Sequence, residues 1–195
     1  MHLFFSTPVW VSKIANYETT NKEMLNYILD LQKRDPIGVT KSNFLGWHSK
    51  NFDLRDQAPK NFLEVIKKEI NIALTDMNCD LEKQFVKIPN LWAIINEKGA
   101  MNQKHQHSNS DISAAYYVEA KDNCGDILFY DPRPARTYKH PIPKSPNSLN
   151  STVNSIKPEV GLLVLFPSYL EHSVNPNLSK NKRIVISFNI SLEKK

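Results

Sequence analysis

Three histidines make up the part of the sequence that is best suited to chemistry. His105 and His107 are separated by one residue, and His172 follows much later in the chain. On an extended segment the side chains at i and i+2 point to the same side, so this pair shares one face. A distant third imidazole then closes a metal site, and imidazole binds iron, zinc, nickel and copper. We therefore predict one metal bound by these three histidines, whereas His2 and His48 lack such a context.

The first half of the chain is predicted to be helical after an opening extended piece at residues 4–14. Residues 21–34 place apolar side chains at helical spacing, and Pro36 ends that helix. A second amphipathic helix is predicted over residues 58–78, with Pro59 in its first turn. These two helices are the expected support for whatever follows.

The second half changes to short runs that are rich in β-branched and aromatic residues. Such runs without intervening helices predict an antiparallel sandwich or barrel, with the two helices packed on one sheet. The chain is long enough for a single domain over residues 1–195, with helical support at about 15–80 and a β core at about 85–192. The predicted strands are residues 91–96, 112–118, 126–130, 152–157, 161–166 and 183–192.

A proline-rich loop at residues 132–150 interrupts these strands. Loops of this length in compact domains are usually functional lids or disordered segments, and prolines favour a semi-rigid lid. A lid and a mobile surface loop both remain open. His140 lies inside the loop and is left outside the metal site, because no rigid element holds it.

The composition excludes several classes of protein. Two cysteines are too few for a disulfide framework, and no apolar run approaches the length of a membrane span. The start lacks the features of a secretory leader, so we expect a soluble cytoplasmic protein without a membrane partner. The net charge of +5 comes from scattered basic residues rather than from one patch, which makes nucleic acid an unlikely partner.

Several segments together resemble a known family. They are Gly99-x5-His105-x-His107, the strand at 112–118, residues 125–133, residues 161–176, and the run that begins at Arg183. Over residues 91–190 they are similar to Fe(II)/2-oxoglutarate-dependent oxygenases related to prolyl 4-hydroxylases, and the opening residues also match the family's usual start. The resemblance implies a mainly β fold with N-terminal helices: the double-stranded β-helix, a jelly roll of eight core strands.

The resemblance also assigns roles by position. His105 matches the first metal histidine, His172 the distal one, and Arg183 the basic residue that pairs with the C5 carboxylate of 2-oxoglutarate. A guanidinium presents a planar fork to a carboxylate, which suits that role. Strand alternation places Ser187 and Asn189 on the same face as Arg183, so both are candidates for lining the cosubstrate pocket.

Four further residues are candidates for the same pocket. Tyr116 and Tyr117 are adjacent on the strand after the histidine pair, and only one of them faces inward to offer a hydroxyl to the carboxylate. Asn96 and Asn102 are plausible polar neighbours at the mouth of the jelly roll.

One position departs from the family pattern. The pattern is His-x-Asp/Glu followed by a distal His, and His107 stands where the carboxylate is expected. A neutral imidazole leaves Fe(II) with its full double positive charge, which favours a dianionic cosubstrate and alters reactivity toward oxygen. His107 is therefore either a third ligand or a neighbour of an open metal position.

Two alternatives stay open. Cupins, another jelly-roll family, carry Gly-x5-His-x-His-x3,4-Glu, and the present chain has Asp111 near the position of that Glu. A cupin-type metalloenzyme would not use 2-oxoglutarate and would not need Arg183. The second alternative is a non-catalytic jelly-roll binding module.

The leading hypothesis is an enzyme that binds Fe(II), 2-oxoglutarate and molecular oxygen. It would hydroxylate a C–H bond of a peptide or small-molecule substrate, with prolyl 4-hydroxylase-like chemistry as one form, and a homodimer is compatible with the sequence. DNA-repair oxygenases of this class carry a second arginine six residues after the first, whereas this chain has Asn189 there. Nucleic-acid dealkylation is therefore not expected.

Overall fold

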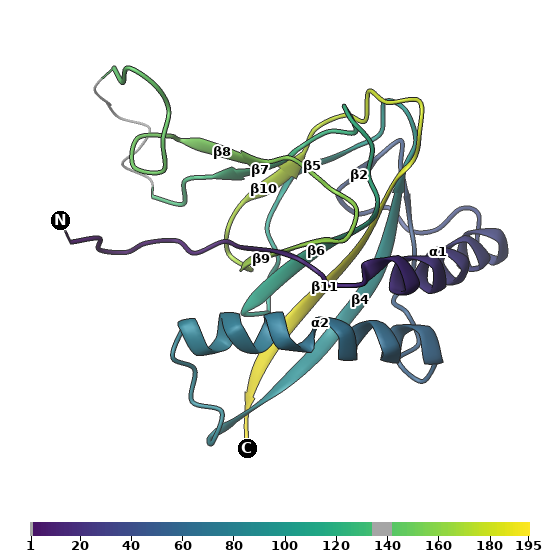
Figure 1. The fold of residues 1–195 in the computed structure, drawn as a ribbon, viewed down its shortest axis with the longest axis horizontal. Helices are drawn as coiled ribbons and strands as arrows, with labels where there is room; N and C mark the ends of the chain where they lie inside the picture. Colours follow the sequence, from purple (N-terminus) through teal and green to yellow (C-terminus); the bar gives the residue numbers. More distant parts are fainter. Residues whose placement is uncertain (1, 134–141) are drawn as a thin grey trace.

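Two antiparallel sheets and two helices make up the computed structural model of the chain, which describes residues 2–133 and 142–195 (Figure 1). The helices are α1 (Tyr17–Arg34) and α2 (Gln57–Asp76). The larger sheet has the order β1 (Trp10–Lys13), β9 (Leu162–Pro167), β6 (Ile112–Glu119), β11 (Arg183–Lys194), β4 (Gln84–Asn96) and β3 (Trp47–His48). The smaller sheet has the order β2 (Asn43–Phe44), β5 (Met101–His105), β10 (His172–Val174), β7 (Ile127–Tyr130) and β8 (Val153–Ile156).

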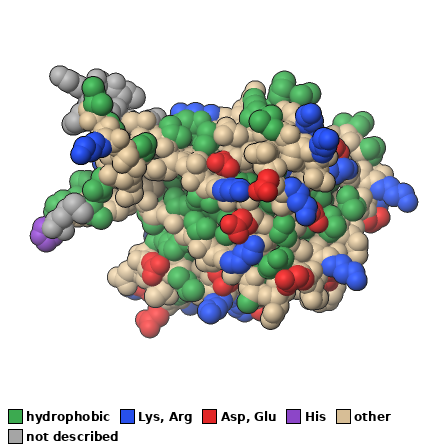
Figure 2. Space-filling view, turned by 45° about the horizontal axis from the view of Figure 1, so that its top comes forward, with side chains coloured by type: hydrophobic (Ala, Val, Ile, Leu, Met, Phe, Trp, Pro, Cys, Tyr) green, Lys and Arg blue, Asp and Glu red, His purple; other side chains and the backbone are tan. Residues whose placement is uncertain are grey.

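Charged side chains of both signs are interspersed on the face of the molecule drawn in Figure 2. Most of the ion pairs at the surface join exposed lysines or arginines to nearby carboxylates, as in the pair between Lys87 and Glu193 at 2.9 Å. Within the part of the chain that the structure describes, no helix has the length and apolarity needed to cross a lipid bilayer.

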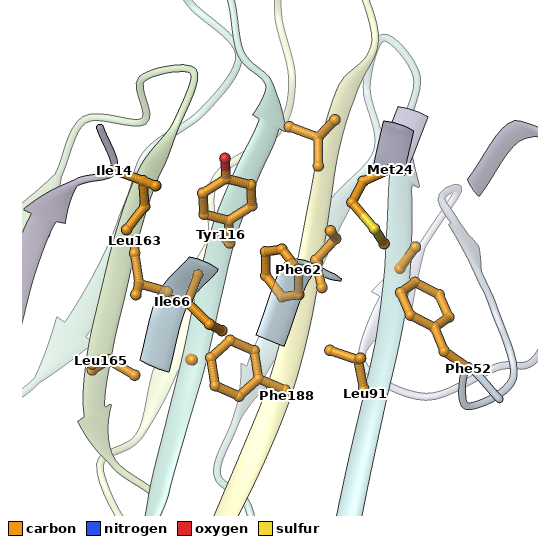
Figure 3. Close-up of a cluster of buried hydrophobic side chains, with 14 of the residues drawn as sticks. Ile14, Met24, Phe52, Phe62, Ile66, Leu91, Tyr116, Leu163, Leu165 and Phe188 are labelled. Atoms are coloured by element: carbon orange, nitrogen blue, oxygen red, sulfur yellow. The ribbon is translucent and has the colours of Figure 1, made fainter. Parts of the chain in front are cut away.

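Both helices lie against one face of the larger sheet and bury the main hydrophobic core there (Figures 1 and 3). The apolar stripe of α2 contributes Phe62 and Ile66, and α1 contributes Met24, all without exposed surface. Their partner on β11 is Phe188, whose ring lies 6.2 Å from that of Phe62. Helical spacing on one side and strand alternation on the other therefore produce one interface.

Strand alternation on β11 separates the core from the cavity between the two sheets. Residues 184, 186, 188 and 190 face the helices in the main core. Val185 belongs instead to a second apolar cluster on the opposite side of the sheet. Arg183, Ser187 and Asn189 share the parity of Val185, so they point between the sheets.

The predicted jelly roll with two helices on one sheet is confirmed, with corrections to individual elements. Helix α1 begins at Tyr17, four residues before the predicted start, and the predicted strand at 91–96 is only the second half of β4. Each predicted strand is present, and β1 lies inside the extended piece predicted at residues 4–14, but four others (β2, β3, β5 and β10) were not placed as separate strands. Strand β5 has the sequence MNQKH, which lacks the β-branched and aromatic residues that mark a strand.

Candidate active site

Pairing between two short strands brings the first and third histidines together. Strand β10 pairs antiparallel with β5, and in this register His172 lies directly opposite His105. Their ring centroids are 4.2 Å apart. His107 follows the end of β5, where its backbone N–H donates to the carbonyl of Ser168 at 3.0 Å. The ligand nitrogens of the three histidines all lie within 4.8 Å of one another.

Hydrogen bonds set the tautomer of two of these rings. Nδ1 of His172 lies 2.9 Å from the carbonyl oxygen of Leu170, and Nδ1 of His105 lies 2.7 Å from that of Gln103. A carbonyl only accepts, so each Nδ1 carries the proton and each Nε2 keeps a free lone pair for a metal. The ring of His107 is oriented by stacking instead, at 5.2 Å from His172 and 5.7 Å from Trp92.

Burial keeps all three imidazoles neutral. It lowers the pKa of His172 to about 3 and that of His107 to about 4, with the neighbouring His105 adding to both effects. Burial also lowers the pKa of His105. A proton and a metal compete for the same lone pair, so rings that resist protonation suit metal ligation at neutral pH.

The donor set fits a divalent transition metal such as Fe(II). Imidazole nitrogens bind such metals at about 2.1 Å, so two ligands on one ion are at most about 4.2 Å apart. The observed limit of 4.8 Å exceeds that value, so the rings have to move closer together by at least about 0.6 Å before all three can bind one ion. Among the described residues this is the sole cluster of metal-binding groups, and it contains no carboxylate.

Asp111 does not join the histidines. Its Oδ2 accepts a hydrogen bond of 2.7 Å from the backbone N–H of Leu192, at the far end of β11. The four-ligand arrangement expected of a cupin-type site, with Asp111 in place of the glutamate, is therefore not formed.

The triad opens into a cavity of about 850 Å³ between the two sheets. The buried residues Arg183 and Tyr117 line it, and its other walls come from both sheets and from the segment that precedes α2. The polar lining residues are Lys41, Ser42, His48, Ser49, Lys50, Asn51, Asn90, Asn102, Gln103, Lys104, Gln106, Ser108, Ser187 and Asn189.

Arg183 is a buried cation without an anionic partner. Only 1% of its surface is exposed, and no carboxylate of a described residue forms an ion pair with it. Its Nη1 donates to the carbonyls of Cys124, Gly125 at 3.0 Å and Asn175 at 3.2 Å. Its Nη2 is buried and has no hydrogen-bond partner among the described residues. Burying an unpaired charge costs free energy, so this guanidinium is well placed to bind an anion.

Gly125 makes room for the guanidinium. Its φ of +92° lies in the region that favours glycine, and an added Cβ would sit 2.7 Å from Nη1 of Arg183 and 2.2 Å from the carbonyl oxygen of Asn175. Sequence reasoning included Gly125 in a motif but gave it no role. The positive φ was not visible in the sequence, although a glycine before a predicted strand is the signal that points to it.

The structure separates the two candidate tyrosines. Tyr117 lines the cavity beside Arg183, and burial raises its pKa. Tyr116 faces the opposite side of β6 and packs against Phe62 of α2, with 5.1 Å between ring centroids. Its hydroxyl donates to Asn21 of α1. Tyr116 therefore belongs to the helix interface and does not reach the cosubstrate pocket.

The other predicted pocket residues also divide. Ser187, Asn189 and Asn102 line the cavity, whereas Asn96 does not. Asn96 has no exposed surface, and its amide nitrogen donates to the side-chain oxygen of Asn102 at 3.1 Å. Asn96 was expected to line the pocket, but it instead holds the side chain of Asn102, which does line it.

Sequence reasoning missed two aromatic residues of the cavity wall. Trp92 stacks between His107 and His48, with 5.6 Å between its ring and that of His48. Trp92 pairs across the sheet with Ser187, and residues paired in this way lie on the same face. The alternation on β11, which placed Ser187, could therefore have placed Trp92 in the cavity as well. His48 lies on a strand of two residues, which is too short to show any periodicity.

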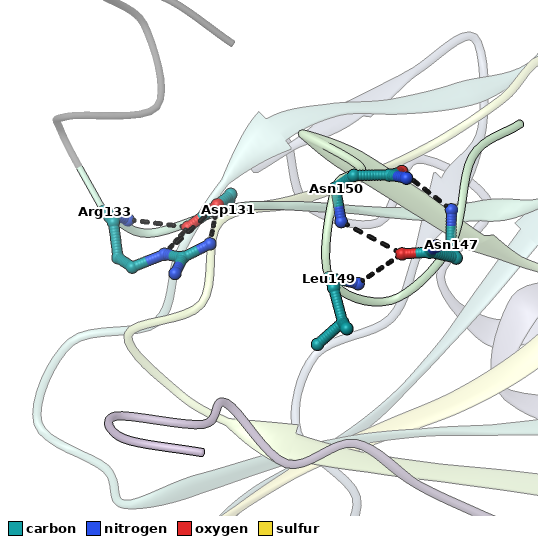
Figure 4. Close-up of polar contacts among 5 residues, drawn as sticks. All are labelled: Asp131, Arg133, Asn147, Leu149 and Asn150. Carbon is teal, nitrogen blue, oxygen red and sulfur yellow. Dashed lines mark hydrogen bonds and ion pairs between the residues drawn. The ribbon is translucent and has the colours of Figure 1, made fainter. Parts of the chain in front are cut away.

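The described part of the proline-rich loop stays away from the cavity. Residues 134–141, with His140, lie outside the described residues. In Figure 4 the side chain of Arg133 pairs with Asp131 at 2.6 Å, and the Oδ1 of Asn147 accepts from the backbone of Leu149 at 2.8 Å. No described residue of the segment 132–150 lines the cavity. A lid role remains a prediction.

A family model described as "Putative 2OG-Fe(II) oxygenase" matches residues 90–189, the stretch that contains the triad and Arg183. No curated protein matches the chain.

Solved structures of low sequence identity share the fold. A prolyl-4-hydroxylase from Pseudomonas putida is similar over 97% of this chain and 94% of its own, with 10% identity and a TM-score of 0.67. A prolyl hydroxylase from Trichoplax adhaerens, in complex with a hypoxia inducible factor peptide fragment, is similar over 93% of this chain and 82% of its own, at 14% identity and a TM-score of 0.63. The α-ketoglutarate-dependent epimerase SnoN from nogalamycin biosynthesis is similar over 95% of this chain and 78% of its own, at 10% identity and a TM-score of 0.68.

Proposed function

The chain belongs to the family of 2-oxoglutarate/Fe(II) oxygenases, and from this we propose that it hydroxylates a C–H bond of a peptide or small-molecule substrate. The cofactors of the family are Fe(II) and 2-oxoglutarate, and the histidine triad is suited to iron. The proposal is the hydroxylation itself, because structures with this fold include epimerases as well as prolyl hydroxylases.

One observation carries the proposal. A buried guanidinium with an unpartnered Nη2 lines the same cavity as three neutral imidazoles with converging nitrogens. A dicarboxylate is the ligand that satisfies both groups together, with one end at the metal and the other at Arg183. Planar pairing between a guanidinium and a carboxylate is strong and fixes orientation, which is what a cosubstrate needs.

The residues of the chain then have separate tasks. His105 and His172 present Nε2 to the iron, and we assign His107 to a third position. Arg183 orients the far carboxylate of 2-oxoglutarate, with Tyr117 beside it. When bound, iron and 2-oxoglutarate supply the oxygen chemistry, with succinate and carbon dioxide as coproducts. The apolar residues between the sheets exclude water from that reaction.

Anaerobic spectroscopy tests the proposal directly. Adding Fe(II) and then 2-oxoglutarate to the protein without oxygen should produce a weak visible charge-transfer band, and admitting oxygen should produce succinate. The Arg183→Met variant should need at least tenfold more 2-oxoglutarate to develop the band, because the far carboxylate loses a charge-assisted pair worth about 1.5–3 kcal/mol.

Arg55→Met is the matched control, since Arg55 is an exposed arginine that pairs with Asp53 outside the cavity. Its 2-oxoglutarate requirement should equal that of the unaltered protein. Bound iron without any band, or an unchanged requirement in Arg183→Met, contradicts the use of 2-oxoglutarate. Protein that binds no metal points instead to a binding module.

A further inference from the structure

The charges that line the cavity are all of one sign. Arg183, Lys41, Lys50 and Lys104 contribute to its walls, and no aspartate or glutamate is among the described residues that line it. The proposed function accounts for Arg183, which faces the far carboxylate of 2-oxoglutarate. The three lysines lie nearer the mouth, and their charges are not explained by the cosubstrate.

Two of these lysines are already neutralised. Lys50 forms an ion pair with Asp35 at 3.0 Å, and Lys104 forms one with Glu171 at 2.6 Å. Lys41 differs, because its side chain makes no ion pair with any described residue. A lysine at the mouth of a cavity without acidic residues is therefore free to pair with a ligand.

The backbone directs this lysine to the cavity. Lys41 lies two residues before β2, the strand that pairs with β5 and so with the element that carries His105. The backbone N–H of Lys41 donates to the side chain of Asn43 at 2.7 Å, and the amide of Asn43 donates to the carbonyl of Gly46 at 2.7 Å. These bonds brace the short turn on which Lys41 stands.

His48 is a second polar group on the same wall. It is 8% exposed, and its Nδ1 lies 2.6 Å from the carbonyl oxygen of Ser49, so Nδ1 donates there. Its Nε2 forms no hydrogen bond with a described residue, so that nitrogen is available as an acceptor for a ligand. The positive charge of Lys41 reaches His48, because it helps burial to lower the pKa of that ring.

This wall is separated from the cosubstrate anchor. His48 pairs with Ile94 of β4, and Ile94 pairs in turn with Val185 of β11, two residues beyond Arg183. His48 and Arg183 are thus two strands apart across the sheet, or about 10 Å at the usual strand spacing. A 2-oxoglutarate molecule that extends from the triad to Arg183 leaves the wall of Lys41 and His48 for another ligand.

We propose that the substrate of this oxygenase is a small molecule with a carboxylate and no cationic group, and that Lys41 and His48 form its recognition site. The inference rests on the proposed function and names its substrate class. Lys41 pairs with the carboxylate, while Nε2 of His48 accepts a hydrogen bond from an amide or hydroxyl of the same molecule. An ammonium group would face the unpaired charge of Lys41 and would find no carboxylate among the described lining residues, so acylated amino acids fit and free amino acids do not.

Matched ligand pairs test the recognition site. N-acetyl-L-amino acids, with N-acetyl-L-proline among them, and their uncharged amides differ only in the carboxylate. Their dissociation constants would be measured by NMR on protein loaded with zinc(II) and 2-oxoglutarate, where no turnover occurs. At least one acid should bind about tenfold more tightly than its own amide and than the free amino acid, and added salt should weaken that preference.

Two lysine variants localise the effect. Lys41→Met should lower the affinity for the acid about threefold to tenfold and leave the affinities for the amide and for 2-oxoglutarate unchanged. Lys68→Met is the control, because Lys68 is exposed on α2 on the other side of the larger sheet. His48→Phe keeps an aromatic ring against Trp92 and should weaken the acid and the amide alike.

The outcomes separate the two proposals. If 2-oxoglutarate binds in an Arg183-dependent manner but no acid binds more tightly than its amide, the recognition site is overturned and the proposed function stands. An acid preference that survives Lys41→Met also overturns the site. If 2-oxoglutarate itself does not bind to the metal-loaded protein, the proposed function fails first.

Discussion

Arg183 is held in place by backbone carbonyls, and a single glycine decides whether those carbonyls remain in position. We predict that Gly125→Ala lowers both the free energy of unfolding and the affinity for 2-oxoglutarate. The new Cβ would lie 2.2 Å from the carbonyl oxygen of Asn175 and 2.7 Å from Nη1 of Arg183, so the backbone or the guanidinium has to move. Denaturant titration and the anaerobic Fe(II) titration measure the two effects.

Gly99→Ala is the control for backbone strain. Gly99 has a similar φ of +87°, but an added Cβ there meets nothing within 4 Å. Both variants carry the cost of placing alanine at positive φ, of the order of 1–2 kcal/mol, and only Gly125→Ala adds the collision. Equal 2-oxoglutarate affinities in the two variants would show that Gly125 does not position Arg183.

His107 is the ligand whose role the hydrogen bonds leave least constrained, because its ring is oriented by stacking. We predict that His107→Ala weakens Fe(II) binding at least tenfold and that His107→Asp recovers part of the loss, since a carboxylate at this position gives the usual donor set of the family. Iron affinity would be measured by equilibrium dialysis without oxygen. His2→Ala, at an exposed position far from the triad in sequence, is the control.

An unchanged iron affinity in His107→Ala would place His107 outside the coordination sphere. The metal would then be held by His105 and His172 alone among the protein groups, and Trp92 would orient a ring that shapes the cavity. Absorbance of the Fe(II) and 2-oxoglutarate complex distinguishes the two cases further, because loss of a ligand opens a coordination position and shifts the band.

At the scale of elements, the side chain of Asn21 ties α1 to the larger sheet through two hydrogen bonds within an apolar interface. Asn21 donates to the carbonyl of Val118 at 2.8 Å and accepts from the hydroxyl of Tyr116. Tyr116→Phe leaves the buried oxygen of Asn21 without its donor, so we predict a loss of about 1–3 kcal/mol in the free energy of unfolding. The 2-oxoglutarate affinity should not change, because Tyr116 faces the helices.

Tyr169→Phe is the control for that loss, since Tyr169 is 55% exposed and the removal of an exposed hydroxyl costs little. Tyr117→Phe tests the opposite face of the same strand. It should change the 2-oxoglutarate affinity, because Tyr117 lines the cavity beside Arg183. A reduced 2-oxoglutarate affinity in Tyr116→Phe would contradict the separation of the two faces.

The elements also show how far sequence can reach. Alternation along β11 placed Arg183, Ser187 and Asn189 on one face, because a strand of twelve residues has a clear period of two. The same rule left Tyr116 and Tyr117 undecided, since alternation states that they face opposite ways without stating which way is inward. Helix packing on the side of Tyr116 decides it, and that contact is tertiary.

Short elements fell outside the same reasoning. Strands of two, three and five residues carry His48, His172 and His105, and such strands form only because neighbouring strands satisfy their backbone groups. Their pairing cannot be read from local propensity. His48 was therefore assigned no role, whereas His105 and His172 were found through their motif spacing.

At the scale of the whole molecule, the buried histidines link stability to pH. Burial holds the pKa of His172 at about 3 and that of His107 at about 4, while the unfolded chain has histidines near 6.5. As the pH falls below about 6.5, these histidines become protonated in the unfolded state but stay neutral in the folded state. Each such histidine then lowers the free energy of unfolding by about 1.4 kcal/mol per pH unit, until the pH reaches its folded pKa.

We therefore predict that the metal-free protein loses stability steeply between pH 6.5 and pH 5, before the carboxylates titrate. Denaturant titrations across this range measure how the free energy of unfolding changes with pH. His172→Gln removes one titrating group, so it should reduce that slope by about 1.4 kcal/mol per pH unit. Zinc(II) at a hundred times its dissociation constant should add about 2.7 kcal/mol. That increment should change little over the same range, because folded rings with such low pKa values offer the metal almost no competition from protons. If the stabilisation by zinc(II) were lost at pH 5, the triad would be protonated in the folded protein. Burial would then not lower the pKa values of these histidines as described.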